Sequence, residues 1–303
     1  MKPGIVAAFV AAALSLGGCS SAEDDGKRLE AITAAMEKLR PLAAKLGKPG
    51  PSDWLACHEE PGQTFEQYRA CKPVRPTSAR RTLYVQPLGA FTEMERKVVT
   101  LTADFMGRYF ALPVKVLDDL PLSLVPKSAR RGYEVTGDEQ IRTGYVLDEV
   151  LKPRLPRDAV AYIALTTSDL WPGPGWNFVF GQASLRDRVG VWSIHRFGTP
   201  EGDAAAFRLC LLRTLKVATH ETGHMFSMYH CTAWQCNMCG SNHMKEADAT
   251  PLALCPECVA KLWWITGADP VGRYRKLAEF CKAQGLKPQQ ECYEKAIQAL
   301  EGR

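Results

Sequence analysis

Three histidines within residues 220–230 constrain this 303-residue chain more than any other feature. His220 and His224 are four residues apart, which on an α-helix places both imidazoles on one face, where both can bind one metal ion. On a continuous helix the side chain of His230 would point about 80° away from that of His220 and lie about 15 Å further along the helix axis. It can share the metal only if the helix ends shortly after His224 and the chain folds back. Glu221, beside the first histidine, could polarise a metal-bound water.

Four cysteines follow the histidines in two close pairs: Cys231, Cys236, Cys255 and Cys258. Four residues separate the first two and two separate the last two, which is ligand spacing for a tetrahedral four-cysteine zinc site. Outside the cytosol the same thiols could instead oxidise to the disulfides Cys231–Cys236 and Cys255–Cys258. Zinc is favoured over disulfides, because bound metal holds thiolates in place. Met238, two residues after Cys236, is expected to lie beneath the histidine site.

Together, HExxHxxxxxHC, the following CxM and the later CPxC resemble the active-site signature of the archaemetzincins, a branch of the metzincin zinc proteases. The resemblance implies a catalytic zinc on the three histidines, with Glu221 as general base and acid. It implies Met238 as the methionine of the turn under that metal. It also implies a structural zinc on the four cysteines, and therefore two zinc ions per chain.

The chain departs from the family pattern at two places. Ser227 stands three residues after the second histidine, where the pattern has glycine, and the segment from Met238 to Cys255 is one residue shorter than the pattern. Glycine adopts the left-handed backbone that lets the helix turn there, whereas serine adopts it at a cost of about 1–2 kcal/mol. Neither change removes a ligand. Serine in place of glycine at this turn affects the exact position and orientation of the His230 ring.

Length and composition describe a globular protein with one large domain or two small ones. The chain is 46% apolar and 23% charged, which is typical of that class. Its net charge of +5 is too small and too evenly spread to favour nucleic acid as a partner. A peptide or protein substrate is the expected partner, and the sequence does not set the oligomeric state.

Residues 1–18 resemble a bacterial lipoprotein signal peptide. Lys2 precedes an apolar run from Ile5 to Leu16 that is too short to span a bilayer, and small residues then lead to Cys19. The implied product begins at a lipid-modified Cys19 in the cell envelope. Ser20 favours the periplasmic face of the outer membrane over the inner membrane. The alternative is an ordinary secretory signal with an incidental cysteine, and export is expected in both cases.

From residue 81 strands alternate with helices, which predicts an α/β (α+β) fold with a mixed, mainly parallel sheet. By resemblance this is a metzincin-like sheet with a long active-site helix and a C-terminal helical subdomain that carries the four-cysteine zinc knuckle. Expected divisions are the leader 1–18, a tether, helix and irregular segment 19–80, and the metallopeptidase domain 81–303. Strands are expected at 82–87, 114–117, 159–166, 177–183 and 189–197. Helices are expected at 92–111, 141–151, 259–265, 270–284 and 288–300. The long helix is expected to open with Thr199 as its N-cap and Pro200 as its first residue, and to be apolar nearly all round over 204–226.

The remaining cysteines and histidines receive weaker assignments. Cys57–Cys71 and Cys281–Cys292 are plausible local disulfides in an oxidising compartment. The sequence does not fix which of these four cysteines, Cys210 and Cys239 pair with one another. The segment His58–Glu60 is expected in a solvated turn. His195 and His243 are not expected to be metal ligands.

The expected function is peptide-bond hydrolysis by a zinc-activated water, with Glu221 as the base. By resemblance, a peptide docks in extended form along the edge strand at 177–183, whose unpaired N–H and C=O groups suit strand addition. The alternative is a non-catalytic zinc-binding lipoprotein, whose metalloprotease-like fold serves peptide or partner binding or metal buffering. Glu221 argues against it, since a binder needs no base. The sequence sets neither a substrate and cleavage preference nor an activation mechanism.

Overall fold

A computed structural model describes residues 22–302 of the chain. The expected signal peptide and the lipid attachment site at Cys19 lie outside these residues. Within 22–302, no helix has both the length and the apolar character that crossing a membrane requires.

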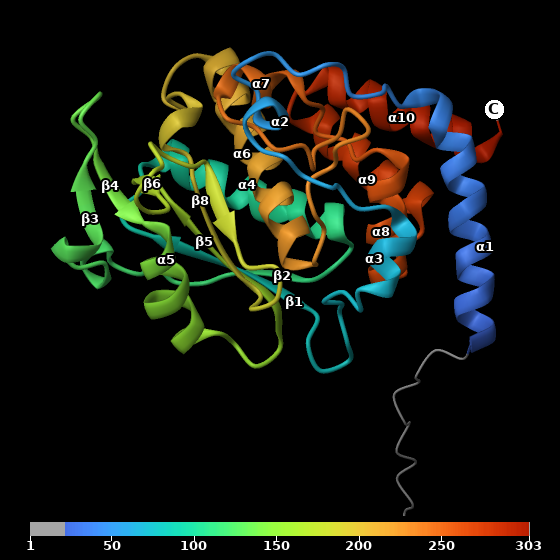
Figure 1. Ribbon diagram of the computed structural model, residues 1–303, viewed down its shortest axis with the longest axis horizontal. Helices are drawn as coiled ribbons and strands as arrows, with labels where there is room; N and C mark the ends of the chain where they lie inside the picture. Colours follow the sequence, from blue (N-terminus) through green and yellow to red (C-terminus); the bar gives the residue numbers. More distant parts are fainter. Residues whose placement is uncertain (1–21, 303) are drawn as a thin grey trace, which may run out of the picture.

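A five-stranded sheet lies at the centre of the fold (Figure 1). Its order is β2 (Val114–Val116), β1 (Thr82–Leu88), β5 (Ala159–Thr166), β8 (Val189–Ser193) and β7 (Gly181–Ala183). The first four strands run parallel, and β7 pairs antiparallel with β8 at one edge. The expected mixed, mainly parallel sheet is therefore confirmed.

Both faces of this sheet are covered, because successive side chains of a strand point to opposite faces. Leu83 and Ile163 join the larger core, formed with the helices α4 and α6. Tyr84 and Tyr162, one residue along each strand, join a second core on the other face. All eight side chains of β5 are buried, which agrees with its continuous apolar sequence and its central place.

Two long helices pack on the larger core. α4 (Glu93–Phe110) begins with the expected capping box, in which Thr92 and Glu95 bond each other's backbone N–H. α6 (Ala204–Met225) begins later than predicted, so the assignment of Thr199 as its N-cap is wrong. Asp203 caps it instead, since its carboxylate accepts from the N–H groups of the second and third helical residues.

The predicted helix 141–151 is only partly correct. Its first residues form β4 (Glu139–Arg142), which pairs with β6 (Asp169–Trp171) and with β3 (Arg130–Gly132) in a second, three-stranded sheet. The rest is the short α5 (Thr143–Tyr145) and the π-helix η4 (Val146–Leu151). Ile141 pairs with Leu170, 29 residues away, and a local apolar pattern could not reveal that contact. Short 3-10 helices cover Arg40–Leu42, Leu122–Leu124, Lys127–Ala129, Lys152–Arg154 and His195–Phe197.

The C-terminal helices and α1 form a helical layer at one end of the sheet (Figure 1). They are α1 (Ala22–Leu39), α8 (Pro256–Thr266), α9 (Pro270–Ala283) and α10 (Lys287–Glu301). α9 and α10 form the expected hairpin, but Cys281 and Cys292 are free thiols, as are Cys57 and Cys71. The two local disulfides are therefore absent from the described residues.

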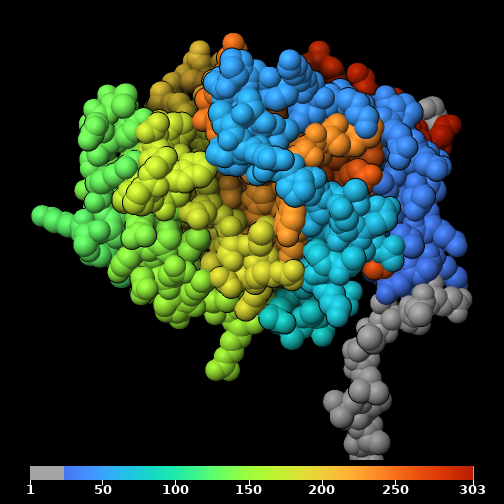
Figure 2. Space-filling model, viewed as in Figure 1, coloured from blue at the N-terminus to red at the C-terminus, as the bar shows by residue number. Residues whose placement is uncertain are grey.

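Residues 43–75, which we call the N-terminal strap, run across the face of the molecule that carries α6 (Figures 1 and 2). The strap includes α2 (Trp54–Cys57) and α3 (Phe65–Ala70). Leu46 N–H donates to the carbonyl of Ala233 at 3.1 Å, and the Tyr68 hydroxyl donates to the carbonyl of Phe226 at 2.8 Å. The strap is therefore bonded to the segment that follows α6.

Candidate metal centres and active site

α6 carries the first two histidines in its last two turns and then stops. The N–H groups of Ser227 and Met228 bond back to the carbonyls of His224 and Gly223, at 2.7 and 3.1 Å. Ser227 has φ +65°, the left-handed conformation in which glycine is usual. The expected reversal after His224 is present, and the serine makes it without breaking the helix end.

Two hydrogen bonds offset the strain at Ser227. Its hydroxyl donates to the carbonyl of Leu185 at 3.0 Å and accepts from the N–H of Val74 at 3.2 Å. The side chain is buried, so losing these partners leaves polar backbone groups unsatisfied.

We expect Ser227→Ala to destabilise the zinc-loaded protein by about 1–3 kcal/mol, because alanine keeps the strain and loses both hydrogen bonds. Ser227→Gly loses the same bonds but relieves the strain, so it should be about 1 kcal/mol more stable than the alanine variant. Urea unfolding with excess zinc measures the difference. An alanine variant as stable as the glycine variant would contradict it.

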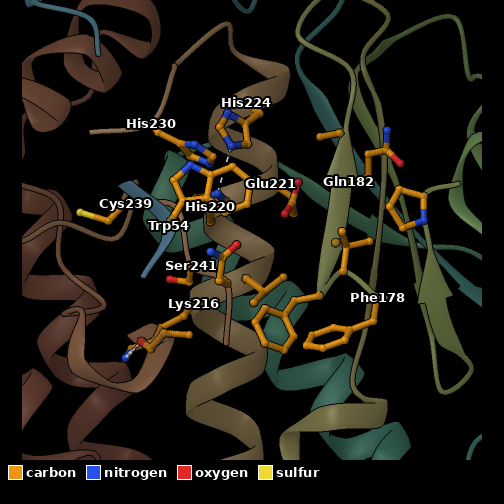
Figure 3. Close-up of a pocket in the computed structure, with 18 of the residues that line it drawn as sticks. Trp54, Phe178, Gln182, Lys216, His220, Glu221, His224, His230, Cys239 and Ser241 are labelled. Atoms are coloured by element: carbon orange, nitrogen blue, oxygen red, sulfur yellow. Dashed lines mark hydrogen bonds between the residues drawn. The ribbon is translucent and has the colours of Figure 1, made fainter. Parts of the chain in front are cut away.

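The third histidine, brought back by the turn, completes a site with the first two (Figure 3). One ring nitrogen from each of His220, His224 and His230 lies within 4.8 Å of the others. The Nε2 atoms of His220 and His224 are 3.0 Å apart. Each Nδ1 instead faces an oxygen at 2.7–2.9 Å: the carbonyl of Asn237 for His220, the carbonyl of Met228 for His224, and the Glu60 carboxylate for His230. The Nδ1–H groups are thus used as donors, and the Nε2 lone pairs are left for a metal.

The electrostatics of the site favour the neutral forms of His220 and His224, which can bind a metal, over their protonated forms. Burial, and then the neighbouring His230, lower the pKa of His220 to about 3. Burial also lowers the pKa of His224 well below its ordinary value. Both imidazoles are therefore neutral near pH 7, which is the form that binds zinc. Three converging ring nitrogens are the donor set of a catalytic zinc site.

Glu221 lies on α6 between the histidines and the edge strand β7 (Figure 3). Its side chain is buried, and burial raises the pKa of its carboxyl group to about 8. Gly181 of β7 makes room for it, since a Cβ there would lie 2.7 Å from the Glu221 Cγ. A divalent cation beside Glu221 would lower this pKa and favour the carboxylate.

We expect Gly181→Ala to reduce kcat/KM for peptide hydrolysis by about 100-fold, because the added methyl group displaces the Glu221 carboxylate. Zinc content should not change. Gly144→Ala is the control, since a Cβ at Gly144 meets nothing within 4 Å. Equal kinetics for both variants and the wild type would contradict the expectation.

A cavity of about 770 Å³ opens beside the three histidines and Glu221. One wall is the edge strand β7 and the loop before it, including Phe178. The other wall is α6 and the segment after Asn237, and Trp54 of the strap joins it. The space-filling view shows the hollow between these parts of the chain (Figure 2). The edge strand is shorter than the predicted 177–183, because Arg131 and Gln140 side chains, rather than a strand ladder, hold the carbonyl of Asn177.

The four cysteines form a separate buried cluster immediately after His230. Their sulfur atoms all lie within 4.8 Å of one another, and those of Cys231 and Cys255 are 3.8 Å apart. Tetrahedral zinc with bonds of about 2.3 Å places its sulfur ligands about 3.8 Å apart, whereas a disulfide needs about 2.05 Å. The N–H groups of Met238 and Cys255 point at the Cys236 sulfur, at 3.5 and 3.2 Å. The cluster, completed by Cys258, fits zinc, and its cysteines are free thiols.

Met238 lies under the helix that carries the histidines. It is buried, and its sulfur would be 2.6 Å from a Cβ at Gly223, between His220 and His224 in sequence. The adjacent Asn237 ties this turn to α6, since its side-chain amide donates to the Thr219 hydroxyl at 2.8 Å.

A third group of possible ligands, Asp53, His243 and Glu246, has its polar atoms within 4.8 Å of one another. Glu246 uses both oxygens to accept from the N–H groups of Trp54 and Asn242, at 2.8 and 2.7 Å. His243 Nδ1 accepts from the Glu246 N–H at 3.1 Å, and its Nε2 lies 3.3 Å from Asp53. These bonds join the strap to α7 (Met244–Ala249). The remaining histidine, His195, pairs with Asp138 on the surface.

Two residues of the site were not found from the sequence. Glu60 was expected in a solvated turn, and that expectation is wrong, because its carboxylate contacts His230 at 2.9 Å. Gly181 was treated only as part of a strand. Neither role leaves a local signal, since Glu60 is 170 residues from His230 in the chain. The weak hint was an acidic and aromatic group, WLACHEE, within a proline-containing segment.

A fold that brings three imidazoles to one point, beside a buried carboxylate and an open sheet edge, is that of a zinc-dependent metallopeptidase. The sequence model of peptidase family M54 matches residues 141–263. Human archaemetzincin-2 is 37% identical over 262 residues, which cover 76% of this chain and 72% of that protein. The chain belongs to the archaemetzincins, peptidase family M54.

Two further comparisons agree with this assignment. Human archaemetzincin-1 is 28% identical over 81% of this chain and 55% of its own length. The crystal structure of an archaemetzincin from Methanopyrus kandleri superposes with a TM-score of 0.50 and 27% identity, over 64% of this chain and 99% of that one. The archaemetzincin fold and family expected from the sequence are confirmed.

Proposed function

We propose that this archaemetzincin hydrolyses peptide bonds at the three-histidine site. His220, His224 and His230 bind a catalytic zinc through Nε2, and Glu221 is the general base. One observation carries the assignment: each Nδ1 has an oxygen partner, so three Nε2 lone pairs face one point beside a carboxylate. The resemblance in sequence to the metzincin signature supports the same roles.

Zinc, when bound, polarises the scissile carbonyl and lowers the pKa of a water at its open position. The Glu221 carboxylate takes a proton from the attacking water and passes it to the nitrogen of the leaving amine. Burial beside Gly181 holds that carboxylate in place and keeps bulk water from it. β7 provides backbone N–H and C=O groups along which an extended peptide binds.

The cysteine cluster holds a second, structural zinc in this proposal, through Cys231, Cys236, Cys255 and Cys258. It braces the segment that returns His230 and Met238 to α6. The spacing of the sulfur atoms and the N–H groups aimed at Cys236 support this assignment. Two zinc ions per chain follow, one of them catalytic.

Metal analysis of the purified protein tests these assignments. We expect two zinc ions per chain, and one in His224→Ala, which removes a ligand from the histidine site only. Cys292→Ser, at an exposed thiol outside both clusters, is the control and should keep two. Unchanged zinc content in His224→Ala would overturn the assignment.

We also propose that the protein is exported and anchored by lipid at Cys19, at the periplasmic face of the outer membrane. Residues 1–18 are then the removed leader, 19–80 an N-terminal segment, and 81–303 the metallopeptidase domain. The short apolar run that ends in LGGC supports this. Labelling of cells with a radioactive fatty acid should mark the wild type and not Cys19→Ala, and labelling of both would refute the anchor.

A further inference from the structure

Glu60 of the strap faces the histidine that α6 does not carry. Both of its carboxylate oxygens lie 2.9 Å from the His230 Nδ1. The two side chains are 25% and 16% exposed, so the pair is largely shielded from solvent. His230 therefore has a charged partner where His220 and His224 have backbone carbonyls.

The strap is bonded to the residues immediately before His230 and contacts the His230 ring itself. The Gln63 amide donates to the Ser227 carbonyl at 3.3 Å, and its oxygen accepts from the Tyr229 N–H at 3.2 Å. The Trp54 ring lies edge-on to the His230 imidazole, with centroids 5.1 Å apart. These contacts fix Glu60 relative to the third histidine.

We propose that Glu60 is a positioning residue for the catalytic zinc. Its carboxylate holds the proton of His230 on Nδ1 and orients the ring, so that Nε2 faces the metal. The inference rests on the proposed function to the extent that His230 is a zinc ligand. Loss of such a partner typically weakens metal binding 10–100-fold.

Competition with a chromogenic chelator at one fixed pH measures the zinc dissociation constant of the histidine site. We expect Glu60→Ala to weaken binding 10–100-fold. Glu60→Gln should lose less, because its amide oxygen still accepts from Nδ1–H. Glu59→Ala, at the exposed neighbour, should bind as the wild type does. The visible spectrum of the cobalt-substituted protein should change in Glu60→Ala and not in Glu59→Ala.

The cysteine zinc serves as the test of folding, since Glu60→Ala should retain it. Wild-type affinity and an unchanged cobalt spectrum in Glu60→Ala would overturn the inference. A protein that binds zinc with the expected Glu60 dependence but cleaves no peptide would instead overturn the proposed function alone.

At the cavity wall, three aromatic rings stack against one another with their centroids at the corners of a triangle. Trp54 and His58 come from the strap, and Trp176 comes from the loop before β7. The His58 ring centroid lies 4.0 Å from that of Trp54 and 5.7 Å from that of Trp176, and the two indoles are 6.2 Å apart. All three rings line the cavity.

The two tryptophans of this stack are anchored on opposite walls. The Trp54 ring lies on Gly240, where a Cβ would be 2.5 Å from the indole, and the backbone N–H of Trp54 donates to Glu246. On the other wall, the Arg131 guanidinium donates to the carbonyls of Trp176 and its neighbour Asn177, at 3.0 and 2.8 Å. The stack is therefore a bridge between the walls.

We propose that this bridge limits how far a peptide extends along β7 on the side of Trp176. Trp176 is five residues before Gly181, which faces Glu221. Five extended residues span at most about 17 Å. The inference rests on the proposed function: the substrates are peptides whose chain ends within about five residues of the cleaved bond on that side.

Peptides with one central sequence, lengthened stepwise at either end, test the bridge. We expect the wild-type kcat/KM to fall at least tenfold once one end extends beyond about five residues. Trp176→Ala should raise kcat/KM for the longer peptides relative to the shorter ones at least tenfold, so that the dependence on length is lost. Val135→Ala, an exposed apolar side chain outside the cavity, should keep the wild-type profile.

The same series is titrated calorimetrically onto the inactive Glu221→Gln protein, with and without Trp176→Ala. A wild-type profile in the Trp176→Ala protein, or no dependence on length in the wild type, would overturn the inference. If binding to the Glu221→Gln protein depends on peptide length but the wild type hydrolyses no peptide, the proposed function is overturned and the bridge is still supported.

Discussion

Glu221→Gln should lower kcat for peptide hydrolysis by about 10³-fold, within the range of 10²–10⁴ typical for loss of a general acid–base group. Glutamine has nearly the shape of glutamate, so its contact with Gly181 is retained. The amide cannot take a proton from water at neutral pH. Steady-state kinetics on a fluorogenic peptide measure the loss, and the peptide should still bind.

The zinc content of Glu221→Gln should equal that of the wild type, because no ligand is changed. Glu93→Gln, at an exposed position on α4, is the matched control and should keep full activity. Activity near the wild-type level in a zinc-loaded Glu221→Gln protein would show that another group serves as the base.

The convergence of the three histidines could be predicted because short-range geometry constrains it. A spacing of four on a helix places His220 and His224 together, and the position of His230 requires a turn that the structure shows at Ser227. The same holds for the capping box of α4 and for β5, whose apolar sequence indicates a buried central strand.

The missed features depend on contacts between distant parts of the chain. β4 forms because Ile141 meets Leu170, although the same residues have a helix-like apolar spacing. Glu60 gains its role only when the strap crosses the returning segment. Gly181 matters because the Glu221 side chain packs directly against it. Such contacts leave no periodic pattern, so the strap was assigned as irregular sequence rather than as a wall of the site.

The second large effect is expected at the cysteine cluster. Cys231 directly follows His230, and its N–H donates to the Met238 carbonyl at 2.7 Å. Cys236 is buried and its sulfur accepts from the N–H groups of Met238 and Cys255. The cluster therefore holds the segment that brings both His230 and Met238 to α6. Binding of metal by the thiols and ordering of this segment should be coupled.

Cys236→Ser should accordingly lose more than one metal ion. A structural zinc contributes about 10–16 kcal/mol of apparent binding free energy, and its loss releases the segment that positions His230. We expect zinc to fall from two per chain towards none, with a large decrease in Tm, whereas His224→Ala falls only to one. We therefore expect unequal effects: zinc at the histidine site should depend on zinc at the cysteine site, and the reverse should not hold. A Cys236→Ser protein that keeps one zinc, full peptidase activity and the wild-type Tm would show instead that the histidine site is held by α6 and the strap alone.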